Sequence, residues 1–137
     1  MRTSSIVLAS VVLQTAAAMA ANPAKFDLHC TGVLTNILTG QTSPWTNWIK
    51  IDLDSRQYCL AGCLSKPPDV DPIQEVTADR IVLEDEGKDK YNSNTIVISR
   101  VDGAIRLENR SMDVGVAFKV QGKCTASQFT GFPKTLF

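Results

Sequence analysis

Apolar and polar residues alternate along most of the chain, which is the pattern of half-buried β-strands. The alternation is regular in residues 26–32 (FDLHCTG), 48–54 (WIKIDLD) and 114–121 (VGVAFKVQ), and a further apolar run occurs at 81–83 (IVL). Clusters of turn residues separate these segments, and helical periodicity is scarce. The pattern therefore predicts an all-β chain.

Residues 95–110 (TIVISRVDGAIRLENR) predict a β-hairpin. Asp102-Gly103 suits a two-residue type I′ turn, in which both residues need a positive φ. That turn pairs Ile98 with Leu107. The register then agrees with the hydrophobic pattern, because one face carries all of the following apolar residues: Ile96, Ile98, Ile105 and Leu107.

The strands number about six to eight and follow one another mostly up and down. Joining the first strand to the last gives a small antiparallel β-barrel, closed or nearly closed, which leaves few exposed sheet edges. A two-sheet β-sandwich is the alternative that this pattern leaves open. Residues 21–137 have the length of a single domain.

Four cysteines predict two disulfides in an exported chain. Cys30 is in phase with the buried residues of the first strand, and Cys124 is in phase with those of the last. These phases favour a Cys30–Cys124 bond between neighbouring strands and leave Cys59–Cys63 as a local pair. In the chain-entropy model, the long-range bond stabilises the fold by about 4 to 5 kcal/mol.

Residues 1–20 have the three parts of a secretory signal peptide. Arg2 gives a positive start, residues 6–18 are mostly apolar, and Ala-Met-Ala at 18–20 offers the small residues that a signal peptidase inspects. A transmembrane anchor is the competing interpretation, but the apolar run is too short and contains polar residues. We therefore expect a cleaved leader, no transmembrane segment in the mature chain, and a periplasmic or extracellular protein.

The charge of the chain argues against two classes of partner. It has 14 lysines and arginines and 14 aspartates and glutamates, so its formal net charge is zero. No half of the chain is strongly basic, and no basic run interleaves with aromatic residues. The sequence therefore predicts no nucleic-acid partner and offers no basic run for a membrane surface.

Cys59 and Cys63 are separated by three residues. Thioredoxin-type pairs are separated by two and lie at a helix start in a βαβ unit, and a zinc site would need two further ligands. The only histidine is His29, on the outer face of its strand. A structural disulfide is the favoured interpretation, and a thiol redox role for Cys59 and Cys63 is the alternative.

The sequence contains no recognisable catalytic constellation. His29 neighbours Asp27 on one strand face, but a surface histidine is favoured over an acid–base role. The acidic run at 84–86 lacks the spacing of a calcium loop, and residues 84–90 are predicted to form an exposed turn. We therefore expect no enzyme activity, no cofactor and no metal.

Two tryptophans are candidate contact residues. Trp48 falls on the polar face of its strand, Trp45 lies just before it, and exposed indoles are frequent at binding surfaces. Pro67 and Pro68 stiffen the loop that follows the local cysteine pair and are candidates too. The tail is expected to pack against the outside or one end of the barrel through its three phenylalanines, Phe129, Phe132 and Phe137, and a contact patch formed by them is the alternative.

Several segments together suggest a known family: FDLHCTG (26–32), IDLDSRQYC with the following Cys63, DRIVLED, ISRVDG and GKC…FTGFP. With them the chain resembles a family of small, uncharacterised secreted proteins of Gram-negative bacteria. The resemblance covers nearly all of the mature chain. It implies an exported scaffold without a catalytic residue, because the family has no established activity. The layout is more distantly similar to small periplasmic barrels that inhibit lysozyme, although their glycine-tyrosine inhibitory segment is not recognisable.

The leading functional hypothesis is a non-enzymatic binding or envelope-associated module that recognises a protein or a small ligand. The first alternative is a periplasmic inhibitor of a hydrolase such as lysozyme or a protease, with the loop at 64–72 as the inserted element. The second alternative is a thiol redox protein that uses Cys59 and Cys63.

Overall fold

The computed structural model describes residues 23–64, 69–87 and 91–133, and these residues form one antiparallel sheet of nine strands. The predicted signal peptide lies outside the described residues. Two short 3₁₀ helices, η1 (Ala61–Leu64) and η2 (Met112–Val114), complete the described secondary structure. The strands are β1 (Lys25–Asn36), β2 (Thr42–Asp52), β3 (Gln57–Cys59), β4 (Asp71–Pro72), β5 (Glu75–Val76), β6 (Arg80–Glu86), β7 (Asn92–Ser99), β8 (Ala104–Ser111) and β9 (Val116–Gln128).

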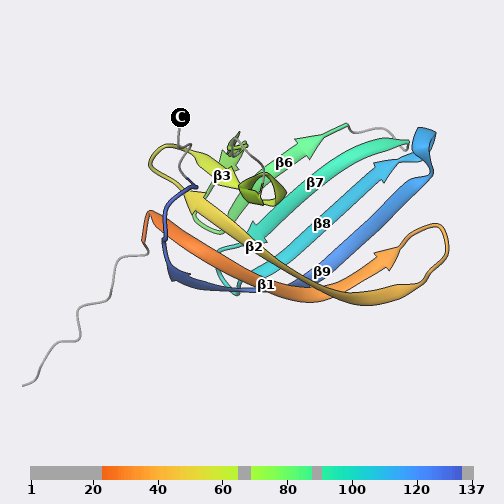
Figure 1. Cartoon of the computed structure of the whole chain (residues 1–137), viewed down its shortest axis with the longest axis horizontal. Helices are drawn as coiled ribbons and strands as arrows, with labels where there is room; N and C mark the ends of the chain where they lie inside the picture. The colour runs from red at the N-terminus through yellow and green to blue at the C-terminus, as the bar shows by residue number, and fades with distance from the viewer. Residues whose placement is uncertain (1–22, 65–68, 88–90, 134–137) are drawn as a thin grey trace, which may run out of the picture.

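The sheet curls into a half-barrel (Figure 1), which confirms the predicted all-β, barrel-like fold. Its strand order is β4-β3-β2-β1-β9-β8-β7-β6-β5, so neighbouring strands are consecutive in the chain except at the pairing of β1 with β9. Nine strands exceed the predicted six to eight, because β4 and β5 have two residues each and are too short to show an alternating pattern.

The two edges of the sheet lie in the middle of the chain, at β4 and β5. The residues between these strands reach both edges. The Ile73 N–H donates to Arg56 O at 2.8 Å, and the Gln74 N–H donates to Val82 O at 3.0 Å. This segment therefore closes one end of the half-barrel, while β2 and β6 remain unpaired with each other at the other end.

The β1–β9 seam joins the first and last strands. Cys30 lies directly opposite Cys124, with a Cα–Cα distance of 3.9 Å, and the two form the predicted disulfide. Gly32 lies opposite Gly122, and a Cβ built on Gly32 would lie 2.3 Å from Gln121 O. The close backbone approach therefore requires glycine at this point.

The interior of the half-barrel is filled by the inward faces of the long strands. The buried side chains come from eight segments and are mostly branched aliphatic, as expected for strand interiors. They form one cluster: Leu28, Cys30, Ile49, Ile51, Tyr58, Ile73, Ile81, Leu83, Ile96, Ile98, Ile105, Leu107 and Val120.

A β-bulge in β6 turns Glu84 toward the interior. The register between β6 and β7 shifts between Val82 and Glu84, so Glu84 pairs with the buried Ile96. Tyr58 donates its hydroxyl to Glu84 Oε1 at 2.5 Å, and Asn94 donates to Oε2. The expectation that Glu84 lies in an exposed turn is therefore wrong. Burial, with Glu84 beside the phenol, strongly raises the pKa of Tyr58.

The hairpin between β7 and β8 forms with a wider turn than predicted. Ile98 pairs with Ile105 rather than with Leu107, although the predicted apolar face is correct. Ser99 explains the difference, because its carbonyl accepts the Gly103 N–H and its Oγ accepts two further turn N–H groups. Gly103 has a positive φ but Asp102 does not, so a type I′ turn is absent.

The last strand begins later than its alternation predicts. Val114 belongs to η2, where the Gly115 N–H donates to Met112 O at 3.1 Å. Val114 and Val116 are both exposed, so the predicted inward face starts only at Phe118. A local turn thus overrides the pattern at this end.

The two disulfides are expected to differ in their effect on stability. Cys30 and Cys124 are 94 residues apart, whereas Cys59 and Cys63 are four apart. Replacing the first pair by alanine should lower the free energy of unfolding by about 4 to 5 kcal/mol, and replacing the second by about 2 kcal/mol. Urea denaturation of both variants measures the difference. Equal losses would contradict the dominant role of the long-range bond.

Candidate functional site

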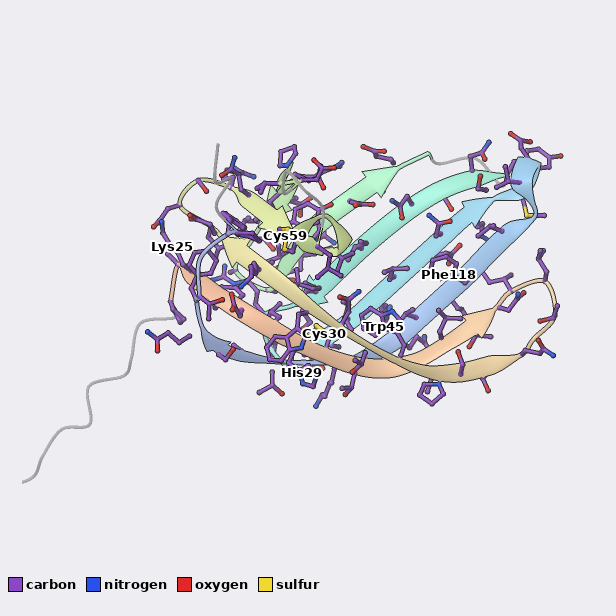
Figure 2. All side chains as sticks on the ribbon, viewed as in Figure 1. Lys25, His29, Cys30, Trp45, Cys59 and Phe118 are labelled. Carbon is purple, nitrogen blue, oxygen red and sulfur yellow. A yellow bond between two sulfur atoms is a disulfide. The ribbon has the colours of Figure 1, made fainter. Side chains whose placement is uncertain are left out.

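An exposed indole marks the outer face of β2. Trp48 is 55 % exposed and lies directly opposite His29 of β1. The two rings are tilted, with centroids 4.5 Å apart. His29 lies next to Cys30 on β1 (Figure 2), and the alternation of the strand turns His29 outward and Cys30 inward.

A groove of about 520 Å³ runs beside this indole. Its floor is the outer face of β1 and β2, one wall is η1 with the residue before it, and the other is the tail after β9. We call it the Trp48 groove. Its lining residues are Asp27, Thr46, Asn47, Trp48, Lys50, Leu60, Cys63, Leu64, Thr130 and Pro133.

The local disulfide fixes one wall of the groove. Cys59 is buried at the end of β3, next to η1 (Figure 2), and its partner Cys63 lines the groove. The bond confirms the predicted pairing. It holds η1 against the sheet and leaves Leu64, 88 % exposed, at the rim. The pair thus has a structural role at this surface.

A polar network ties the tail to the floor. Lys50 Nζ donates to Asp27 Oδ2 at 3.1 Å and also to Thr130 Oγ1, and the Thr130 hydroxyl donates to Asp27 Oδ2 at 2.6 Å. Asp27 is only 5 % exposed, and its second oxygen, Oδ1, has no hydrogen-bond partner among the described residues. The floor therefore keeps one unsatisfied acceptor, which is uncommon for a buried polar atom.

Of the other candidate contact residues, Trp45 does not line the groove. Trp45 lies opposite Gly32 and packs against the buried core, so the two tryptophans face opposite sides of the sheet. Pro67 and Pro68 lie outside the described residues. In the tail, Phe129 packs edge-to-face on Phe132 at a centroid distance of 5.4 Å, and Phe137 is likewise outside the described residues.

Asp71 in β4 lies close to other carboxylates. Burial, together with Asp69 and Glu86, raises the pKa of Asp71 in β4.

Within residues 23–64, 69–87 and 91–133, no group of three or more histidine, cysteine or acidic side chains could hold a metal ion. Asp27 Oδ2 bonds to Lys50 and Thr130, and Oδ1 has no partner in the described part of the chain, so no hydrogen bond joins Asp27 to the His29 ring.

Sequence reasoning identified Trp48 but missed the walls of the groove. The placement of Leu60 and Leu64 depends on how the disulfide folds η1 back, and that of Thr130 depends on the path of the tail. One available signal was the local spacing of the cysteine pair, which favours a tight turn between Cys59 and Cys63.

The comparisons with known proteins found no matching family model, no matching curated protein and no matching solved structure. None of the helices in the described part of the chain is long and apolar enough to cross a membrane. The geometry of the groove is therefore the basis for a functional proposal.

The two tryptophans should differ in fluorescence. In Trp45→Phe the remaining indole, Trp48, is the exposed one, so its emission should lie at long wavelength and acrylamide should quench it efficiently. In Trp48→Phe the remaining Trp45 should emit at shorter wavelength and resist quenching, because it packs against the core. Indistinguishable spectra from the two variants would contradict the opposite placement of the rings.

Proposed function

We propose that this protein is a non-enzymatic binding module whose Trp48 groove receives an extended segment of a partner protein. The observation that carries the proposal is the exposed indole inside a hollow with rigid walls. Tryptophan is the side chain most enriched at the energetic centres of protein interfaces, where the partner removes it from water.

Apolar groups surround the indole at the rim. Leu64 is almost fully exposed, and Leu60 and Pro133 line the same hollow. Covering apolar surface of this kind stabilises a complex by about 25 cal/mol for each Å² removed from water. The disulfide and the Thr130 contacts hold both walls in place before binding, which lowers the entropy cost of association.

The floor supplies polar groups that suit a peptide unit. Asp27 Oδ1 lacks a donor, and Lys50 uses two of its three ammonium protons within the network. A peptide N–H and C=O provide the complementary donor and acceptor. Since Asp27 Oδ1 is buried, the Lys50 ammonium, whose side chain is 20 % exposed, is the group of this network that a partner carbonyl meets first.

The open edge of β2 is a less suitable site for the same partner. Within β2, β3 pairs only with Lys50, Ile51 and Asp52, so in the described part of the chain β1 is the one strand paired with the preceding part of β2. Pro44 has no N–H, and the Asn47 side chain accepts the Trp48 N–H at 2.8 Å. Both features block the addition of a strand, as is common at natural sheet edges.

Hydrolase inhibition is the second candidate function. Its supporting observation is Leu64, which the Cys59–Cys63 bond presents at the start of the loop at 64–72. A redox role has less support, because Cys59 is fully buried and only its partner Cys63, which lines the groove, is open to thiol exchange. We also propose an oxidising, extracytoplasmic location, supported by both disulfides.

The groove can be tested with a displayed library of random peptides. Peptides selected on the folded protein should carry an aromatic or aliphatic anchor. In calorimetry with synthetic copies, Trp48→Ala should weaken binding by about 2 kcal/mol, or roughly 30-fold. Val101→Ala is the control, since Val101 is 80 % exposed but does not line the groove.

Two results would contradict the proposed site: the selection enriches no peptide, or the enriched peptides bind Trp48→Ala as well as they bind the native protein. Circular dichroism and thermal unfolding show whether each variant keeps its fold. The same samples, assayed against lysozyme and serine proteases, test the inhibitor alternative.

A further inference from the structure

A second hollow, of about 730 Å³, lies on the outer face of β7, β8 and β9. It shares no lining residue with the Trp48 groove. Its polar lining is mostly cationic or neutral, and we call it the basic hollow. The residues that matter for its chemistry are Ser93, Thr95, Arg106, Arg110, Lys119 and Gln121.

The charges of the basic hollow are unbalanced. Three cations, Arg106, Arg110 and Lys119, line it together with a single carboxylate, Glu108. The Arg110 Nε donates to Glu108 Oε1 at 2.5 Å, so the charge of this carboxylate is balanced by Arg110. Arg106 and Lys119 are exposed and have no ion-pair partner in the described part of the chain. Two uncompensated positive charges therefore face the hollow.

The register of the sheet explains why these charges gather. Lys119 of β9 lies opposite Glu108 of β8, so it sits between Arg106 and Arg110 on the same face. These arginines are four residues apart, which corresponds to about 13 Å along the strand. The cations thus form a row along the strands, and a polymer can contact them at successive positions.

We propose that the basic hollow binds an acidic polysaccharide, whose carboxylates lie on the cations and whose hydroxyls contact the neutral polar side chains. Ser93, Thr95 and Gln121 offer donors and acceptors beside the cations. None of the lining residues is aromatic, so the hollow offers no surface on which a nucleic-acid base could stack. The extent of the row favours a polymer over a single ion.

This site is independent of the proposed peptide groove. Calorimetric titration with polygalacturonate at low salt should show binding that weakens in 0.5 M salt, because salt screens exposed charges. Arg106→Gln/Lys119→Gln should weaken binding about tenfold, which corresponds to about 1.4 kcal/mol. Arg56→Gln/Arg80→Gln removes the same charge outside the hollow and should bind as the native protein does. Trp48→Ala should also leave this binding unchanged.

Three results would overturn the inference. One is no binding of polygalacturonate at low salt. Another is an equal loss in both double variants, which would indicate a diffuse effect of net charge. The third is that poly-glutamate binds at least as tightly as polygalacturonate, since the hollow would then recognise an acidic protein segment as well as it does a polysaccharide. Uncharged dextran is the control for sugar binding without charge, and it should not bind.

Discussion

The pairing of the first strand with the last is the constraint on which the structure depends. β1 has β2, β3 and β4 on its other side, and β9 has β8, β7, β6 and β5 on its other side. Each of these two groups is assembled from neighbours in the sequence. The β1–β9 seam is the pairing of long strands that joins the two groups. Forming it costs conformational entropy, because it closes a long loop of the chain. The Cys30–Cys124 bond offsets that cost covalently.

The seam also builds the Trp48 groove. Phe26 pairs with Gln128, so the chain leaves β9 beside the start of β1. The tail then crosses the outer face at Asp27, and Thr130 and Lys50 both bond to the Asp27 carboxylate. The alternation that turns Cys30 inward turns Asp27 and His29 outward. One face of β1 therefore carries the disulfide that closes the fold, and the opposite face of the same strand forms part of the floor of the groove.

The features that repeat every two residues could be predicted from the sequence. The inward faces of β1, β2, β7 and β8, and both disulfides through the strand phases, follow from local alternation. The hairpin register could not, because Ser99 and its hydrogen bonds set the turn. The bulge at Val82–Glu84 could not be predicted either. One extra residue in a strand exchanges the inward and outward positions after it, and the composition of the segment does not reveal this.

The sites were harder to predict than the fold because their residues meet only through tertiary structure. Trp48 was identified from its phase, but its neighbours come from η1 and from the tail. The basic hollow draws Arg106 and Lys119 from different strands of a chain whose formal net charge is zero. Neither the net charge of the chain nor a run of like charges in the sequence reveals this cluster, because the cations become neighbours only through the register between β8 and β9.

Native-state hydrogen exchange tests the central role of the seam most directly. The account predicts that the hydrogen-bonded amides of β1 and β9 exchange only through global unfolding, with the free energy found by urea denaturation. Amides of the short edge strands β4 and β5 should exchange through local opening at a lower free energy. Seam amides that exchange at a lower free energy than those of the β7–β8 hairpin would contradict the account, because the two halves of the sheet would then separate before either unfolds.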